Sequence, residues 1–103
     1  MLCNIIHMFE VRYSDVFESW LDDLADVNAK QRVLVRLRRL ELGNAGDAKS
    51  VGDGVSELRI DYGPGYRIYF TRRGRVIVIM LCGGSKKSQI ADIAKAKEMA
   101  KEF

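Results

Sequence analysis

The pattern of hydrophobic and polar positions is clearest between Val55 and Lys87. Two segments alternate apolar and polar residues, a third is continuously apolar from Val76 to Cys82, and glycine-bearing turns separate them. Alternation is typical of a strand with one buried face, and a short unbroken apolar run is typical of a strand buried on both faces. The stretch therefore predicts an antiparallel three-stranded meander that ends in a basic, glycine-rich loop.

The segments around this meander predict its cover. Residues 8–13 alternate like a strand, which could start as early as Ile5. Residues 43–54 have the Gly, Asn and Asp content of a loop. Helical spacing of apolar residues predicts three helices. The first covers residues 15–24, the second runs from the break at 25–28 to about Leu42, and the third runs from Ser88 to about residue 102. The order β-α-α-β-β-β-α indicates an α+β fold: a mostly antiparallel sheet with all helices packed on one face.

Length and composition fit one globular domain over residues 1–103, with 1–7 as a possible N-terminal extension before Met8. The apolar run of the third strand is far shorter than the about 20 residues that span a bilayer. The N-terminus lacks the pattern of a secretory signal, so we expect a cytoplasmic protein that does not engage a membrane. Cys82, within the buried strand, is expected to be a reduced packing residue.

Charge is unevenly distributed along the chain. Residues 1–28 carry one base and six acids, whereas residues 29–103 carry 16 bases and eight acids. Such a domain can bind and orient a polyanion, although a solvated surface with internal ion pairs is an equal alternative. Arg32, Arg36 and Arg39 share one stripe of the second helix, and we expect that stripe to pair with the acids of the first helix.

The meander places candidate chemistry on one face of the sheet. Its even-numbered apolar residues are expected to point to the core, which leaves Arg59 directly opposite either Arg67 or Tyr69 on the other face. Two neighbouring arginines require a carboxylate, from Glu57 or Asp61, or leave a site for an anionic ligand. Further phosphate donors would be Lys86 and Lys87 and the backbone N–H groups of residues 83–85.

Other chemistries find little support in the sequence. The single histidine, His7, precedes the predicted domain, and the two cysteines are far apart, so we expect neither a metal site nor a cofactor. A Ser/His/Asp triad lacks its histidine, and the segment G-G-S-K-K lacks the spacing of a phosphate-binding loop.

Two segments carry a resemblance to a known family: E-L-R-I-D-Y-G-P-G-Y-R-I-Y-F at 57–70 and G-G-S-K-K-S-Q-I-A-D-I at 83–93. They resemble the RelE/ParE superfamily of bacterial type II toxins, and in particular its HigB-like addiction module killer proteins. The resemblance extends from residue 8 to about residue 100. The resemblance implies a ribosome-dependent mRNA endonuclease that uses in-line attack of the ribose 2′-OH. It also implies a cognate helix-turn-helix antitoxin that neutralises it.

Carried onto this chain, the resemblance gives two sets of site residues. The implied catalytic residues are Arg59, Arg67, Lys86 and Lys87. The implied RNA-binding residues are Lys49, Tyr69, Arg36 and Arg39. Members of the RelE type carry a tyrosine in the last helix, whereas residues 88–93 hold no aromatic here. Two alternatives therefore stay open: a non-catalytic gyrase inhibitor of the ParE kind, and a basic nucleic-acid-binding domain without toxicity.

Overall fold

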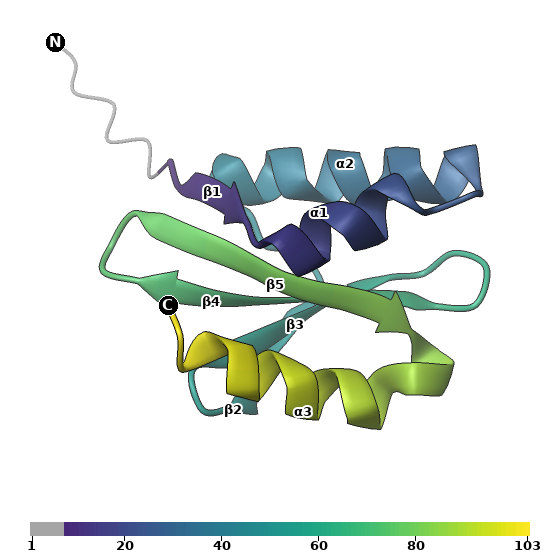
Figure 1. Ribbon diagram of the computed structural model, residues 1–103. Coiled ribbons are helices and arrows are strands. Elements are labelled where there is room, and N and C mark those ends of the chain that lie inside the picture. Colours follow the sequence, from purple (N-terminus) through teal and green to yellow (C-terminus); the bar gives the residue numbers. More distant parts are fainter. Residues whose placement is uncertain (1–7) are drawn as a thin grey trace, which may run out of the picture.

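A computed structural model describes residues 8–103 (Figure 1). The elements follow in the order β1 (Glu10–Tyr13), α1 (Asp15–Asp22), α2 (Val27–Glu41), β2 (Ala48–Gly52), β3 (Val55–Ile60), β4 (Tyr66–Arg73), β5 (Ile77–Ser85), a 3-10 turn η1 (Lys86–Ser88) and α3 (Gln89–Ala100). The five strands form one sheet in the order β1-β5-β4-β3-β2, in which β1 runs parallel to β5 and the other pairs are antiparallel. The α+β class and the meander β3–β5 are confirmed. The possible extension 1–7 and a strand start at Ile5 lie outside the described residues.

The first two helices begin where the sequence supplies side-chain caps. The Ser14 hydroxyl accepts a hydrogen bond from the Phe17 N–H, and the Asp26 carboxylate accepts from the N–H groups of Asn28 and Ala29. Both caps satisfy backbone donors that a helix N-terminus leaves without partners. At its far end α2 stops at Glu41 with Leu42 as its C-cap, and Gly43 follows with a φ of 86°. The predicted boundaries of these helices are therefore confirmed to within about two residues.

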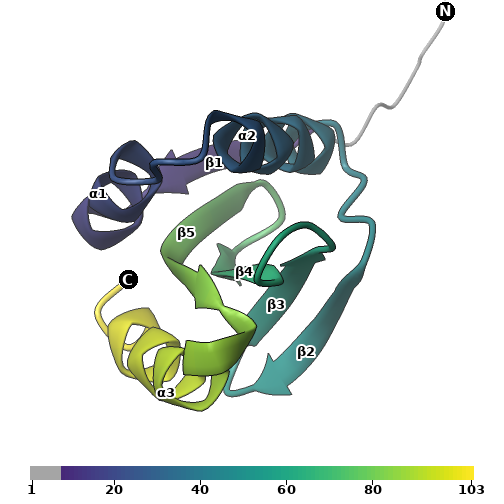
Figure 2. The ribbon, with the colours of Figure 1, turned by 90° about the vertical axis from the view of Figure 1, so that its right-hand side faces the viewer.

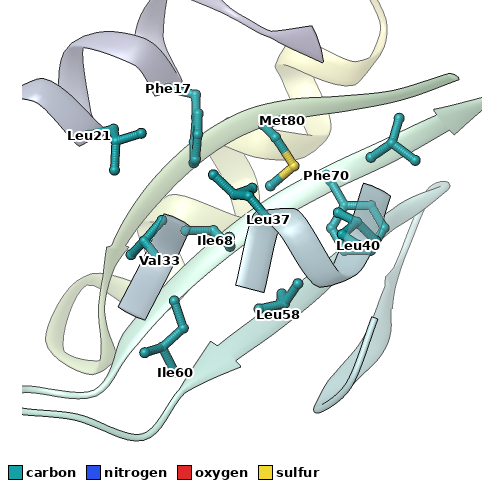
Figure 3. Close-up of a cluster of buried hydrophobic side chains, with 11 residues drawn as sticks. Phe17, Leu21, Val33, Leu37, Leu40, Leu58, Ile60, Ile68, Phe70 and Met80 are labelled. Carbon is teal, nitrogen blue, oxygen red and sulfur yellow. The ribbon is translucent and has the colours of Figure 1, made fainter. Parts of the chain in front are cut away.

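The main core lies between α1, α2 and one face of the sheet (Figure 3). The even-numbered strand residues Leu58, Ile60, Ile68 and Phe70 all point into it, as the alternation predicts. The helices contribute the side chains of Phe17, Leu21, Val33, Leu37 and Leu40. Val78 and Met80 of β5 complete the layer. This core fixes which face of the meander is turned away from α1 and α2.

The expectation that all helices share one face is wrong for α3. Figure 2 shows α1 and α2 on one side of the sheet and α3 on the other. A second core lies beneath α3, formed by Val55, Tyr69, Ile79, Leu81, Cys82, Ala96 and Ala100. The physical reason is the strand β5, whose continuous apolar run is buried on both faces and therefore requires cover from both sides.

The segment 43–54 also differs from its prediction as a loop, because it contains the edge strand β2. Asp53 and Gly54, at the turn into β3, both have positive φ values, of 55° and 76°. Two successive residues in this region characterise the tight turns that join antiparallel strands, and Asp-Gly is a preferred sequence for them. The strand itself, A-K-S-V-G, is short and polar, so its own composition gives little indication of pairing.

Gly83 and Gly84 end β5 where helices approach closely on both sides. A Cβ atom at Gly83 would lie 2.6 Å from the Trp20 indole of α1, and one at Gly84 would lie 1.8 Å from the Asp92 carboxylate of α3. Neither position has room for a side chain. The two glycines thus extend the strand and allow helix packing, and they are paired with Ile68 and Arg67 of β4.

Among residues 8–103, the ion pairs do not join the arginine stripe of α2 to the acids of α1, so that expectation is wrong. Arg36 instead donates hydrogen bonds to the carbonyls of Arg59, Ala45 and Asp47. Arg32 stacks over the Tyr62 ring at 4.6 Å from its centroid. The stripe faces the loop regions because α1 is short and packs mainly against β5. In the same range, the helices are too short or too polar to cross a membrane.

Candidate nucleic-acid interface

Arg59 and Arg67 lie directly opposite each other on β3 and β4, on the face turned away from α1 and α2. Of the two registers that the sequence allows, the structure has the one that pairs these arginines. The next pair on the same face, two positions along each strand, is Glu57 with Tyr69. Directly opposed residues of antiparallel strands project to the same face, with Cβ atoms about 5 Å apart. Two guanidiniums, one carboxylate and one phenol are therefore gathered on four adjacent positions.

The carboxylate of Glu57 organises this group. Its side chain is fully buried. One oxygen accepts from Arg59 Nε at 3.2 Å, and the other accepts from Gln89 Nε2 at 2.7 Å and Tyr69 OH at 3.2 Å. Arg67 Nε lies 3.9 Å from the second oxygen. A buried charge is tolerated only when it is paired and hydrogen-bonded, and Glu57 meets both conditions.

These contacts fix the protonation states of the pair Glu57 and Tyr69. Burial alone would raise the pKa of Glu57, but three hydrogen-bond donors and the charge of Arg67 hold that pKa below its ordinary value. Burial raises the pKa of Tyr69 far above its ordinary value, and the neighbouring Glu57 charge adds to the rise. Near neutral pH the site thus holds an ionised carboxylate and a neutral phenol that donates to it.

Arg67 is mostly buried, with one hydrogen bond on one side and the Glu57 carboxylate on the other. Its Nη1 donates to the Gly65 carbonyl at 2.9 Å, its side chain is only 12% exposed, and its buried Nε makes no hydrogen bond. A Cβ atom at Gly65 would lie 3.2 Å from Arg67 Nη1 and 3.5 Å from Lys86 Cβ. Lys86 therefore starts beside the Arg67 guanidinium, and Lys87 follows it in the exposed turn η1.

Lys49 joins the same face from β2. It lies directly opposite Glu57 in the β2–β3 pairing, and its side chain is exposed. Arg59, with a side chain 39% exposed, lies between this lysine and Arg67. We call the surface formed by Lys49, Arg59, Arg67, Lys86 and Lys87 the basic face. Five cations outnumber the two carboxylates nearby, the buried Glu57 and Asp92 beside Gly84, so the face carries a net positive charge.

The structure separates three predicted residues from the basic face. Arg36 and Arg39 lie on α2, across the sheet (Figure 2). The Arg36 guanidinium donates a hydrogen bond to the backbone carbonyl of Arg59, so Arg36 contacts β3 only from the α2 side. Tyr69 lies on the correct face but is fully buried, so its ring is not available to stack on a base. The role of Tyr69 as an RNA contact stays a prediction; in this structure its ring packs in the second core and its hydroxyl donates to Glu57.

One contributor was not predicted at all. Gln89, the first residue of α3, provides the shortest hydrogen bond to Glu57. A glutamine at a helix start has no distinguishing sequence pattern, so only the register between α3 and β3 identifies it. Ser88 beside it donates to Asp92 at 2.5 Å and also contacts Ser85. The turn η1 that carries Lys86 and Lys87 is therefore tied to the carboxylate below the basic face.

The described residues form neither a metal site nor a reactive thiol. Within 8–103, no group of three or more His, Cys, Asp or Glu side chains is arranged to hold a metal ion. The thiol of Cys82 is buried, and burial together with the nearby Asp92 raises its pKa to about 11. Because the thiolate is the reactive form, this cysteine is a packing residue.

Comparison with known proteins places the chain in a family. Residues 19–102 match the family model described as "Phage derived protein Gp49-like (DUF891)". The chain belongs to the Gp49-like family. It is also 47% identical over 94 residues to a Haemophilus influenzae protein described as uncharacterized, with 91% of this chain and 95% of that protein covered.

Gp49-like proteins are addiction-module toxins of the RelE/HigB type. Membership therefore indicates a toxin of a toxin-antitoxin system, with an antitoxin as its partner. This agrees with the predicted superfamily, while the HigB-like branch stays a prediction.

The hydrogen bonds and charges around Glu57 predict a specific dependence of stability on pH. Because the pKa of Glu57 is lower in the folded than in the unfolded protein, its ionisation stabilises the fold at pH values above the unfolded pKa. This contribution is lost as the pH falls through the folded pKa, below about pH 4. Urea unfolding from pH 7 to pH 3 should show the free-energy difference between wild type and Glu57→Gln shrinking at the acidic end. A difference that stays constant down to pH 3 would contradict this assignment, and Glu98→Gln on the exposed face of α3 should follow wild type throughout.

Proposed function

We propose that this Gp49-like toxin is a ribosome-dependent mRNA endonuclease and that the basic face binds and cleaves the messenger. The observation that carries the proposal is the opposed pair Arg59 and Arg67, held by the buried Glu57 and flanked by exposed lysines. Such an array suits a phosphodiester backbone better than an apolar substrate.

The geometry supports a chemical role for Arg67. In-line attack of a ribose 2′-oxygen on the adjacent phosphorus, with loss of the 5′-oxygen, passes through a state with added negative charge on the phosphate. A cation already fixed in a partly desolvated site stabilises this charge without reorganising during the reaction. Arg67 is fixed in this way by Gly65 and Glu57, whereas the more exposed Arg59 and the lysines suit binding of the flanking phosphates.

Neither Glu57 nor Tyr69 is proposed as a general base. The Glu57 carboxylate is fully occupied by its donors, and the raised pKa of Tyr69 keeps its phenol neutral. The basic face would then act by orientation and charge stabilisation. This agrees with a reaction that depends on the ribosome for the geometry of its substrate.

Induction of the protein in growing cells, followed by primer extension on translated messengers, tests the proposal. Cuts at fixed positions within codons are expected, and they should disappear for messengers without a start codon. Ribosomes that bind the protein while their messengers stay intact would overturn it. A gyrase inhibitor of the ParE kind remains the second candidate, because residues 88–93 provide no aromatic side chain at this site. Inhibition of supercoiling by purified gyrase would identify that activity.

Binding of RNA to the basic face should depend strongly on salt. Each phosphate contact to a single strand contributes about −0.7 to the slope of log K against log salt concentration, so four contacting cations give about −3. Fluorescence anisotropy of a labelled ten-residue oligouridine, measured from 50 to 300 mM KCl, provides this slope. The double variant Lys86→Ala/Lys87→Ala should reduce its magnitude by about 1.4. A slope close to zero would exclude the lysines and arginines as phosphate ligands.

A further inference from the structure

The turn η1 connects the two halves of the basic face. Arg59 and Arg67 project from adjacent strands of the sheet. Lys86 and Lys87, in contrast, lie in a turn that is exposed to solvent. The chain leaves β5 at Ser85, passes through this turn and runs back along the sheet as α3 (Figure 1). The position of the two lysines relative to the arginine pair therefore depends on how the turn is held at its ends.

The two ends of the turn are held in different ways. At its start, Ser85 is still part of β5 and pairs with Tyr66 of β4. At its end, Gln89 is the first residue of α3, and its backbone N–H donates to the Lys86 carbonyl. The Gln89 side chain points to the sheet and donates to the buried Glu57 carboxylate at 2.7 Å. One residue thus contacts both the lysine turn and the carboxylate that binds the arginines.

The other side chains in the first turn of α3 do not make this contact. Ile90 is 88% exposed, and Ala91 is exposed as well. Asp92 lies against Gly84, so it contacts β5 and not β3. Within residues 89–92, the amide of Gln89 is therefore the group that joins the start of α3 to the arginine pair.

We propose that Gln89 is a positioning residue for RNA binding. Through Glu57, its amide holds the lysine turn beside the arginine pair, so that both halves of the basic face bind phosphates of one strand. This role rests on the proposed binding of RNA to the basic face. Arg59 and Tyr69 also donate to Glu57, so the carboxylate is a fixed point for the start of α3. Cations held in place before RNA arrives reduce the ordering cost of binding.

Gln89→Met tests this role, because it keeps the length of the side chain and removes the donor without changing any charge. Anisotropy of the ten-residue oligouridine, measured from 50 to 300 mM KCl, should give a slope of about −3 for wild type. Gln89→Met should reduce the magnitude of this slope by about 1.4, as if two phosphate contacts were lost, although no cation has been removed. Ile90→Met, a neutral change at the next residue, should keep the wild-type slope.

A second comparison separates positioning from a general loss of structure. In the Lys86→Ala/Lys87→Ala variant the lysine contacts are already absent, so adding Gln89→Met should leave the slope unchanged. A general loosening of the fold would reduce the slope further in that variant. In the ¹⁵N-labelled Gln89→Met protein without RNA, the amide resonances of Lys86 and Lys87 should shift, while those of the main core should keep their wild-type positions.

Gln89→Glu makes the contact with Glu57 depend on pH. Two carboxylates in contact share one proton, because the pKa of one of them is raised. At pH 5 the shared proton replaces the amide donor, and RNA affinity should lie within about twofold of wild type. At pH 8 the two charges repel each other, and affinity should be at least about tenfold weaker than that of wild type.

Ile90→Glu is the matched control for this pH dependence. It adds the same charge at an exposed neighbouring position, so its effect on affinity should be equal at pH 5 and pH 8. The other charged or titratable groups around Glu57 are identical in the two variants: Lys49 on β2, Arg59 on β3, Arg67 and Tyr69 on β4, Cys82 on β5, Lys86 in η1 and Asp92 on α3.

Two results would overturn the positioning role. One is a wild-type slope of about −3 that Gln89→Met leaves unchanged, and the other is the same pH dependence for Gln89→Glu and Ile90→Glu. A wild-type slope close to zero would contradict RNA binding by the basic face and, with it, both proposals. Absence of codon-positioned cuts together with the expected slopes would overturn the nuclease alone.

Discussion

Replacing Arg67 with alanine should abolish the growth arrest that the wild-type protein causes. Removing one preorganised donor from a developing negative charge costs about 100- to 1000-fold in rate in well-studied enzymes. Arg67 is the less exposed of the two arginines of the basic face, so its loss should approach the upper end of this range. We expect codon-positioned cleavage to fall at least 100-fold, measured by primer extension at matched protein levels.

The variant should still fold, which makes this test informative. Glu57 keeps its three hydrogen bonds, from Arg59, Tyr69 and Gln89, when Arg67 is absent. Arg75→Ala is a matched control, because it removes the same charge from an exposed position in the turn between β4 and β5. Arg67→Lys separates charge from geometry, since lysine cannot reproduce the fork of the guanidinium. If Arg67→Ala is as toxic as wild type, the chemistry does not take place on this face.

The face that carries these residues could be derived from the sequence, because strand periodicity leaves few choices. Once Leu58, Ile60 and Ile68 are assigned to the core, Arg59 and Arg67 must share the opposite face. The same reasoning identified β5 as buried on both sides. A strand buried on both sides also requires a cover on its second side, and α3 provides that cover.

What lies under the basic face could not be derived from the sequence. Tyr69 has the alternation of an exposed strand residue, yet α3 buries it, since Ala96 and Ala100 allow that helix to approach the sheet closely. Gln89 reaches Glu57 across 32 residues of sequence, through the packing of α3 on the sheet. Strand pairing can be predicted from local patterns, but the position of a helix along a sheet depends on side-chain packing that no short pattern encodes. The buried half of the site was therefore missing from the prediction.

Among the polar residues at the basic face, Glu57 should be the one whose loss destabilises the fold most. Glu57→Ala would leave the mostly buried Arg67 without its counter-charge and the Tyr69 hydroxyl without its acceptor. Removing one partner from a buried pair costs about 3–5 kcal/mol. Domains of this size are stable by only about 5–15 kcal/mol, so the variant should be marginal. Urea denaturation at pH 7, followed by circular dichroism, measures the difference directly.

If Glu57 organises this group, the variants around it should lose stability in a definite order. Gln89→Ala and Tyr69→Phe each remove one hydrogen bond to a charged group and leave the others, so each should cost about 1.5–3 kcal/mol. Glu98→Ala, which breaks an exposed pair with Lys101, should cost about 0–1 kcal/mol. A Glu57→Ala effect no larger than that of Glu98→Ala would show that the arginines hold their positions without the carboxylate. Arg67 keeps its hydrogen bond to the Gly65 carbonyl when Glu57 is removed. This comparison therefore measures the contribution of the Glu57 carboxylate to the placement of Arg67.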